Sequence, residues 1–318
     1  MTRSIGGTWC EFQHHNKAEG VHWNPACAGF SPDDWDAKIA EMAAIGLEYL
    51  VLMAVALDHK AFYPTTLLPP WKLATPDPLQ SLMTAADRHG MKVFVGNGFW
   101  GTWDSPGIIA DPQARRRRLQ AMEELAAQYG QHPSFYGWYW PNEAEIQGHF
   151  RPVFIDYVRE CNQLARQLLP AALTLIAPYG TNQVQADDDY ARQLEALDVD
   201  VVAYQDEVGV RKSGVEETGA YYEALRKVHD QVERARLWAD VEVFEFAAEV
   251  YRSALLPARF ARVRRQLEAV SPFVETILIY QYQGMMNQPG AAAFAGHPDS
   301  TQLFSDYVAW QRCIRSPG

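Results

Sequence analysis

Short apolar runs alternate with longer amphipathic segments along the whole sequence. Residues 47–54 (LEYLVLMA), for example, are apolar at nearly every position, which is typical of a strand covered on both faces in a parallel sheet. The segments between such runs have the length and the polar spacing of helices. We therefore predict strands at about residues 4–12, 47–54, 91–96, 134–140, 173–177, 199–204, 236–243 and 276–280.

Capping and turn residues mark the ends of the helices between these strands. Ser31 supplies an N-cap and Pro32 the first helical position, and Gly46 closes the same helix. Gly90 ends the next helix, and Pro112 begins the one after it. The predicted helices span about residues 32–45, 78–89, 112–129, 150–169, 188–197, 218–233, 257–269 and 302–314.

Eight strand–helix units in succession predict an α/β fold, a single (β/α)8 TIM barrel over residues 1–318. An open doubly wound sheet is the alternative for such alternation. That fold would carry a GxGxxG phosphate-binding turn in its first βα loop, whereas this chain has His14-His15-Asn16 there. No linker or low-complexity stretch divides the chain, so we expect one domain.

Composition and charge narrow the class of ligand. The formal net charge of -11 argues against a nucleic-acid partner and favours a neutral, hydroxyl-rich ligand. The 15 Tyr, 14 Phe and 10 Trp residues indicate either stacking surfaces or a large core. The four cysteines are scattered without CxxC pairs, so we expect neither a zinc ribbon nor a disulfide framework.

The sequence also indicates where in the cell the protein is expected. No apolar run approaches the length of roughly 20 residues needed to cross a membrane, so we expect no membrane partner. The N-terminus leaves no room for the apolar core of a signal peptide, which predicts a cytoplasmic protein unless a leader has been removed. The sequence does not indicate an oligomeric state.

A barrel enzyme holds its active site at the C-terminal ends of the strands. In this chain acids, amides and aromatic residues dominate those positions, with histidines in the first two loops. No Ser–His pair or strand-end lysine indicates acyl-transfer or Schiff-base chemistry. The strand-end candidates are Glu11, His14, His15, Asp58, His59, Asn97, Trp100, Asn142, Glu143, Tyr179, Gln205, Asp206, Glu207, Glu242, Tyr280, Gln281 and Tyr282.

The most informative stretch is residues 135–143 (FYGWYWPNE), where an aromatic strand stops at a proline and presents Glu143 at its tip. Two carboxyls that face each other across an aromatic pocket, one protonated and one ionised, carry out glycoside hydrolysis. Burial against aromatic walls would raise the pKa of Glu143 and suit it to the acid role. Glu242, after the seventh strand, is the expected partner, and Asp206 is the next candidate catalytic carboxyl. Glu242 shares its strand face with Asp240, which would belong to a structural network if that face points into the barrel.

An Asn-Glu pair after strand four, with a second Glu after strand seven, resembles the large retaining glycosidase clan of (β/α)8 barrels, clan A. The resemblance implies that Glu143 is the acid/base, that Asn142 binds the hydroxyl beside the reacting carbon, and that Glu242 is the nucleophile. More narrowly, W-Y-x-P-x-E at 138–143 and Y-Q-D-x-V-G-V at 204–210 are similar to a little-characterised bacterial family of glycosidase-like barrels. Where clan A usually has a tryptophan after strand eight, this chain has Tyr280-Gln281-Tyr282.

Other residues near the strand ends are assigned to a carbohydrate substrate. Aromatic side chains stack on sugar faces, and amides both donate and accept hydrogen bonds. We predict that the sugar is bound by His14, His15, His59, Trp100, Trp140, Asn142, Tyr179, Tyr204, Gln205, Glu207, Trp238, Tyr280, Gln281 and Tyr282. We expect no cofactor and no metal ion.

Two other functions fit the same residues. A barrel that binds carbohydrate without cleaving it would use the same aromatic and amide groups. A metal-dependent sugar isomerase or hydrolase would use His14, His15, His59, Asp206 and Glu242, although these lack the HxH or HExxH spacing of metal motifs. We predict an O-glycosyl hydrolase, with the retaining mechanism that the resemblance implies.

Overall fold

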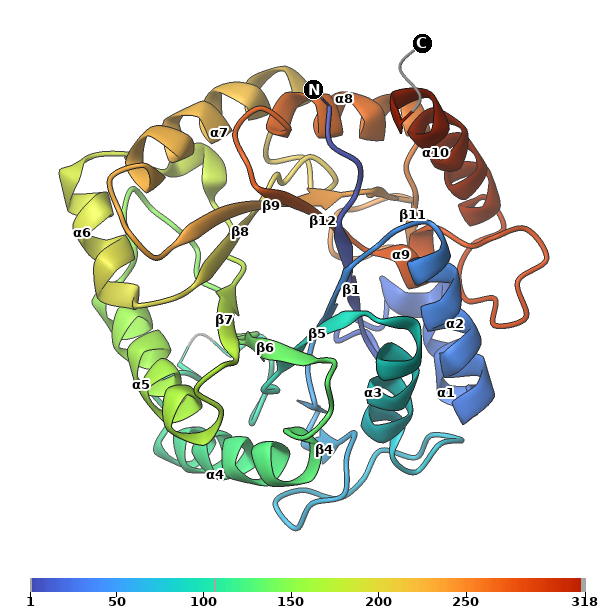
Figure 1. Ribbon diagram of the computed structural model, residues 1–318, viewed down its shortest axis with the longest axis horizontal. Coiled ribbons are helices and arrows are strands. Elements are labelled where there is room, and N and C mark those ends of the chain that lie inside the picture. The colour runs from blue at the N-terminus through green and yellow to red at the C-terminus, as the bar shows by residue number, and fades with distance from the viewer. Residues whose placement is uncertain (1, 106, 316–318) are drawn as a thin grey trace.

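The computed structural model describes residues 2–105 and 107–315. Within them, parallel strands close into a barrel that is surrounded by an outer ring of helices (Figure 1). The strands follow one another around the barrel in sequence order, and the last pairs with the first, which confirms the predicted (β/α)8 barrel. They are β1 (Gly7–Cys10), β2 (Tyr49–Leu52), β5 (Lys92–Gly96), β6 (Phe135–Tyr139), β7 (Leu173–Ile176), β8 (Val201–Gln205), β9 (Arg236–Glu242) and β12 (Thr276–Tyr280).

All the predicted helices are present, with α7 showing the largest displacement of its ends. No helix in the described part of the chain is long and apolar enough to cross a lipid bilayer. The helices are α2 (Pro32–Ala44), α3 (Pro78–His89), α4 (Pro112–Tyr129), α5 (Pro152–Leu168), α6 (Asp188–Leu197), α7 (Val215–His229), α8 (Phe260–Val270) and α10 (Ser300–Arg315).

Local capping explains why the helix starts were predictable. The Ser31 hydroxyl accepts the N–H of Asp34 at 3.2 Å, and the Asp34 carboxylate accepts the N–H of Ser31 at 2.9 Å, which completes a capping box at α2. Helices α3 and α4 each begin with a proline that follows a capping aspartate, Asp77 or Asp111. Gly90 ends α3 at a φ of 68°, in the left-handed region that glycine adopts most readily.

Short elements that the sequence pattern does not predict lengthen the loops at the C-terminal end of the barrel. An antiparallel hairpin of β10 (Phe244–Phe246) and β11 (Leu255–Pro257) follows β9. Helix α1 (Asn24–Gly29) lies in the loop after β1, and α9 (Tyr282–Met285) follows β12. Each is too short to show a hydrophobic period, yet the loops after β1 and β9 supply part of the wall of the cavity described below.

Asn162 on α5 joins the barrel to the helical layer. Its Oδ1 accepts the indole N–H of Trp140 at 2.8 Å, and its Nδ2 donates to the carbonyls of Leu197 at 3.0 Å and Asp198 at 2.8 Å, at the end of α6. Both Asn162 and Trp140 are fully buried. The predicted sugar-stacking Trp140 therefore packs behind the barrel wall.

We expect the substitution Asn162→Leu to lower the free energy of unfolding by about 2–4 kcal/mol, because a buried indole N–H and two helix-end carbonyls lose their partner. Urea unfolding followed by circular dichroism measures the change. Gln163→Leu, at the exposed neighbouring position of the same helix, is the matched control and should change stability by about 0.5 kcal/mol or less. Equal stability of Asn162→Leu and wild type would contradict this account of the contact.

Candidate active site

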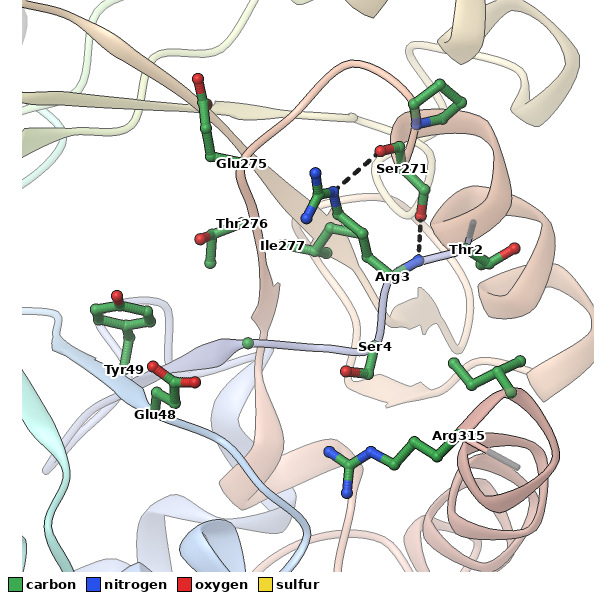
Figure 2. Close-up of a pocket in the computed structure, with 13 residues that line it drawn as sticks. Thr2, Arg3, Ser4, Glu48, Tyr49, Ser271, Glu275, Thr276, Ile277 and Arg315 are labelled. Carbon is green, nitrogen blue, oxygen red and sulfur yellow. Dashed lines mark hydrogen bonds between the residues drawn. The ribbon is translucent and has the colours of Figure 1, made fainter. Parts of the chain in front are cut away.

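Two cavities lie at opposite ends of the barrel. At the N-terminal ends of the strands, a cavity of about 630 Å³ is lined by polar residues that include Arg3, Glu48 and Glu275. Figure 2 shows Arg3 held by Ser271, through its backbone N–H to the hydroxyl at 2.8 Å and its Nε to the carbonyl at 3.1 Å. Residues at this end of a (β/α)8 barrel serve stability, whereas the chemistry lies at the opposite end.

The second cavity, of about 470 Å³, is at the C-terminal ends of the strands and is the candidate active site. Glu143 and Glu242 both line it, although the two residues are far apart in the sequence. Parallel strands bring them together because all C-terminal ends meet at one rim. The strand-end residues that line the cavity are His14, His15, Glu143, Tyr179, Gln205, Glu207, Asp240, Glu242 and Tyr280.

Glu143 follows β6 after the segment Trp140-Pro141-Asn142 and is open to the cavity. Although the side chain of Glu143 is exposed to the cavity, the protein that surrounds it desolvates the carboxyl, and this desolvation raises the pKa of Glu143 to about 7. The phenol of Tyr139 donates to its Oε1 at 3.1 Å and limits the rise. A carboxyl with such a pKa is partly protonated near neutral pH, as a general acid must be.

Glu242 ends β9 and is 3% exposed. Its Oε2 accepts the backbone N–H of Val210 at 2.8 Å. Burial, and then the neighbouring charge of Asp206, raise the pKa of Glu242 well above its ordinary value. The Val210 N–H and the charge of Arg262 act in the opposite direction and favour the ionised form.

Asp206 lies behind Glu242 and does not line the cavity. Its Oδ1 accepts the backbone N–H of Glu242 at 3.1 Å and that of Val208 at 3.3 Å, and its Oδ2 accepts Nε2 of Gln266 at 2.7 Å. Burial raises the pKa of Asp206 to about 6. In this position, Asp206 fixes the backbone that carries Glu242 and makes no contact with the cavity.

Glu207 and Lys212 form one wall of the cavity. The Oε2 of Glu207 accepts the backbone N–H groups of Gly180 at 2.8 Å and Thr181 at 2.9 Å, so this carboxylate fixes the loop after β7. The amine of Lys212 lies 3.4 Å from the other Glu207 oxygen and 4.7 Å from the centre of the Tyr179 ring. The charge of Lys212 is therefore matched by a carboxylate and an aromatic face.

A buried ion pair occupies the wall after β1. Nδ1 of His14 lies 2.9 Å from Oε1 of Glu11, and its Nε2 lies 3.0 Å from Oε2 of Glu19. Tyr280 donates to Oε2 of Glu11 at 3.2 Å, and Gln281 donates to its Oε1 at 2.7 Å. Burial opposes a charge on His14, but Glu11 and Glu19 outweigh it and raise the pKa of His14 to about 9.

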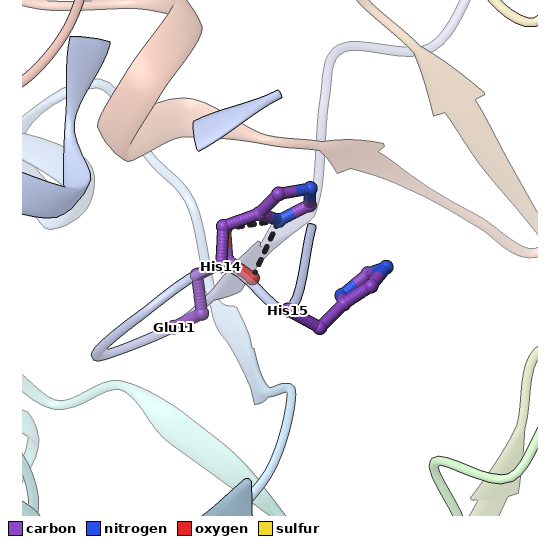
Figure 3. A group of neighbouring side chains, drawn as sticks. All are labelled: Glu11, His14 and His15. Carbon is purple, nitrogen blue, oxygen red and sulfur yellow. Dashed lines mark hydrogen bonds and ion pairs between the residues drawn. The ribbon is translucent and has the colours of Figure 1, made fainter. Parts of the chain in front are cut away.

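The same wall contains the one group of potential metal ligands found among the described residues. One ligand atom from each of Glu11, His14 and His15 lies within 4.8 Å of the others. Figure 3 shows hydrogen bonds between Glu11 and His14, with the ring of His15 set to one side. Because both ring nitrogens of His14 are already engaged, a metal ion would have to displace this network. The residues fit an imidazolium–carboxylate pair better than a metal centre.

The ion pair of His14 leads to an expected pH dependence of stability. Its folded-state pKa of about 9 lies above its ordinary value of 6.5, so the stabilisation is fully present below pH 6.5 and is lost as the pH rises through 9. We expect the stability difference between wild type and His14→Gln to shrink by about 3 kcal/mol between pH 6.5 and 10. Urea unfolding at several pH values measures it. His59→Gln, at an exposed histidine, is the control, and a pH-independent difference for His14→Gln would contradict the charged state.

Several predicted sugar-binding residues lie outside the cavity lining. Tyr204 precedes Gln205 on β8 and therefore faces the helices, where its hydroxyl lies 2.9 Å from that of Tyr190. Trp238 lies near the start of β9, and its ring centre is 4.8 Å from that of Tyr49. Tyr204 points away from the lumen because side chains alternate along a strand. Trp238 lies too deep in the barrel to reach the rim.

Other predicted sugar-binding residues lie outside the cavity because their side chains pack within the protein. The indole N–H of Trp100 donates to the carbonyl of Asn97 at 2.8 Å, and the hydroxyl of Tyr282 donates to Glu41 at 3.2 Å. Nδ2 of Asn142 donates to the hydroxyl of Tyr157 at 3.3 Å. The predicted residues that do not line the cavity are His59, Trp100, Trp140, Asn142, Tyr204, Trp238, Gln281 and Tyr282. The histidine set of the metal-dependent alternative is not assembled, since His59 is exposed and outside the cavity.

Further loop residues complete the cavity, and all of them except Trp103, a candidate for stacking on a sugar, are residues that sequence reasoning did not assign to substrate. Trp103 reaches it from the loop after β5, and Lys212 from the loop after β8. An apolar wall comes from the β10–β11 hairpin, through Phe244, Phe246, Tyr251 and Leu255. Lys212 stands two positions after the motif at 204–210, which is the one sequence signal that could have drawn attention to it.

Comparison with known proteins identifies a family. Residues 5–293 match the sequence family described as "Domain of unknown function (DUF4434)". No curated protein matches the chain.

Solved structures share the fold at low sequence identity. A "putative alpha-L-fucosidase" from Bacteroides thetaiotaomicron is 18% identical with a TM-score of 0.76, over 98% of this chain and 94% of that one. An endo-beta-1,4-mannanase from Thermotoga petrophila is 12% identical with a TM-score of 0.61, over 100% and 78%. The protein GH5_18 from Streptomyces cattleya, in complex with GlcNAc, is 17% identical with a TM-score of 0.60, over 100% and 82%. At these identities the likeness establishes the barrel fold.

Proposed function

Because this chain belongs to the family described as a domain of unknown function (DUF4434), membership assigns no activity, and we propose from the cavity itself that the protein is a glycoside hydrolase. One observation carries the proposal: Glu143, after β6, and Glu242, at the end of β9, line a single cavity with aromatic walls. Two carboxyls in such a cavity are the minimum equipment for breaking a glycosidic bond. The named enzymes among the structural neighbours support the proposal by analogy of fold.

Glu143 is the general acid and base in this proposal. Its pKa of about 7 keeps a proton available for the leaving oxygen near neutral pH. The phenol of Tyr139, which is fully buried, holds one carboxyl oxygen at 3.1 Å and orients the group. After the leaving group departs, the Glu143 carboxylate can remove a proton from the water that completes hydrolysis.

Glu242 is the nucleophile. The Val210 N–H binds Oε2, so Oε1 is the oxygen available to attack the anomeric carbon. The attack breaks the bond to the leaving oxygen, which takes the Glu143 proton, and forms a glycosyl ester on Glu242 that water then cleaves. This role needs the ionised form, which Val210 and Arg262 favour and burial opposes. The mechanism uses the form of the enzyme in which the pair carries one proton, at Glu143, and because the pKa of Glu242 is raised, Glu242 must lose its proton before it attacks.

The walls suit a sugar ring. Tyr179, Trp103 and the half-exposed Tyr251 line the cavity, and faces of such rings cover the C–H surface of a sugar. Gln205 lines it as well, and its amide donates to the carbonyl of Ala177 at 3.1 Å while the amide oxygen can accept from a hydroxyl.

A screen with 4-nitrophenyl glycosides tests the proposal. The panel holds both anomers of L-fucose, D-mannose, D-galactose and N-acetyl-D-glucosamine, and the double variant Glu143→Gln/Glu242→Gln is the blank. Release of 4-nitrophenol by wild type alone is the expected result, and nuclear magnetic resonance of the first product should show the anomer of the substrate.

Other outcomes of the screen point to the other functions. Sugar binding in calorimetry with no product at high protein concentration would favour a non-catalytic carbohydrate-binding barrel. Activity that a chelator abolishes would point to the cluster of Glu11, His14 and His15.

A further inference from the structure

Asp240 lines the cavity at a deeper level than the proposed catalytic pair. It precedes Glu242 by two positions on β9, so both side chains point to the lumen, and its carboxyl lies roughly 7 Å further along the strand toward the floor. Its backbone is in register with Gln205 on β8 and Leu278 on β12. The residue is 3% exposed.

The Asp240 carboxyl has no partner among the residues that the structure describes. Its Oδ1 is fully buried and accepts no hydrogen bond from the residues described. Asp206 is the instructive contrast, because it lies in the same group of acids but accepts three hydrogen bonds and stays outside the cavity. A buried polar group without a partner costs about 1–3 kcal/mol, so its retention at the floor of a cavity needs an explanation, and a bound ligand is one.

The surroundings of Asp240 favour its protonated form. Burial, and then the charges of Glu242, Asp206 and Glu143, raise its pKa well above the ordinary value. A protonated carboxyl both donates and accepts a hydrogen bond, which is the pairing that a hydroxyl group offers in return. In the free protein the Asp240 carboxyl forms no such hydrogen bond, and a ligand with hydroxyl groups would supply one.

The charges along the wall disfavour an anionic sugar. The cations that line the cavity in the described chain are Lys212 and the imidazolium of His14. Lys212 is paired with Glu207, and His14 with Glu11 and Glu19, so neither is free to bind a carboxylate, sulfate or phosphate group. Carboxyls dominate the remaining polar surface, and like charges repel.

We propose that Asp240 is a substrate-binding residue that forms hydrogen bonds with a hydroxyl group of the sugar ring held deepest in the cavity. It thereby selects uncharged sugars that carry a hydroxyl at that ring position. The inference rests on the proposed function for the identity of the ligand as a glycoside. Its evidence is separate, because it comes from an unsatisfied carboxyl and not from the catalytic pair.

The matched pair Asp240→Ala and Asp206→Ala tests the proposal without any activity assay. Asp240 forms no hydrogen bond in the free protein, so its removal should not lower the free energy of unfolding. Asp240→Ala should therefore melt at or above the wild-type temperature. Asp206→Ala should melt several degrees lower, because three donors lose their acceptor. A fall for Asp240→Ala as large as that for Asp206→Ala would overturn the proposal.

Ligand-induced melting shifts supply the binding readout. The probes are L-fucose, D-mannose, D-galactose, N-acetyl-D-glucosamine and D-glucose at about 100 mM, with D-glucuronate as the anionic contrast. We expect at least one neutral sugar to raise the melting temperature of wild type and Asp206→Ala, and to have no effect on Asp240→Ala. No shift in wild type with any neutral sugar, or a larger shift with D-glucuronate, would overturn the proposal.

Kinetics on whichever aryl glycoside the wild type cleaves completes the design. Asp240→Ala should lower kcat/KM by about 10–100-fold, and Asp240→Asn, which still donates and accepts, should recover most of that loss. The deoxy substrate that lacks the contacted hydroxyl should be cleaved equally by wild type and Asp240→Ala. Binding shifts without hydrolysis would show that the catalytic proposal fails while the role of Asp240 stands. A kcat/KM for Asp240→Ala within twofold of wild type would refute that role.

Discussion

Replacement of Glu242 by alanine should lower kcat on an aryl glycoside by at least about 10⁴-fold, because the glycosyl ester can no longer form and removal of a catalytic nucleophile costs this much or more. The variant should remain folded, since the substitution removes a buried carboxyl whose charged form is already disfavoured. The measurement is the initial rate of 4-nitrophenol release, with melting temperature as the check on folding.

Rescue by an external nucleophile separates a chemical role of Glu242 from a structural one. Sodium azide should restore turnover of Glu242→Ala and give a glycosyl azide of inverted anomeric configuration, because azide attacks the face that the carboxylate has vacated. Glu245→Gln, at the exposed position of β10, is the matched control and should keep full activity. Undiminished activity of Glu242→Ala on the substrate that wild type cleaves would remove Glu242 from the mechanism.

Replacement of Glu143 by glutamine should cost about 10²–10⁴-fold in kcat/KM on substrates with a poor leaving group, since an amide cannot supply the proton. A 2,4-dinitrophenyl glycoside needs little protonation, so the loss in its first step should be much smaller. Glu123→Gln, at an exposed position of α4, is the charge-matched control.

The pH profile gives a second test of Glu143. The acid works in its protonated form, so the kcat/KM of wild type should fall as the pH rises through about 7, the pKa that desolvation gives Glu143. This alkaline limb should disappear in Glu143→Gln. A limb that persists unchanged in the variant would assign it to another group.

The fold was predictable because its determinants are local. A strand such as β2 is covered on both faces, so its run of apolar residues is visible without knowledge of its neighbours. Ser31, Asp77 and Asp111 cap their helices through bonds to residues three positions later, which the sequence displays directly. The β10–β11 hairpin was not predicted, because three-residue strands are set by pairing across a loop and not by periodicity.

The site was predictable in part for a related reason. Closure of the barrel brings every strand end to one rim, so placing Glu143 and Glu242 at such ends suffices to bring them to the same cavity. Tyr204 and Trp238 show the limit of that reasoning, because strand parity and depth decide which way a side chain points and whether it reaches the rim. Tyr280 ends β12, but most other aromatic residues of the cavity come from loops, as Trp103 and Tyr251 do.

The sequence by itself determined the barrel, the order of its strands and the two carboxyls at the rim, because hydrophobic period, capping and strand ends are properties of neighbouring residues. Only the tertiary structure decided which of the buried carboxyls accept hydrogen bonds. Asp206 and Asp240 are both aspartates near Glu242, yet one is held by three donors behind the wall and the other faces the cavity without a partner. That difference depends on backbone N–H groups and on Gln266, which loop conformation and helix packing bring into place, and no local pattern in the chain records it.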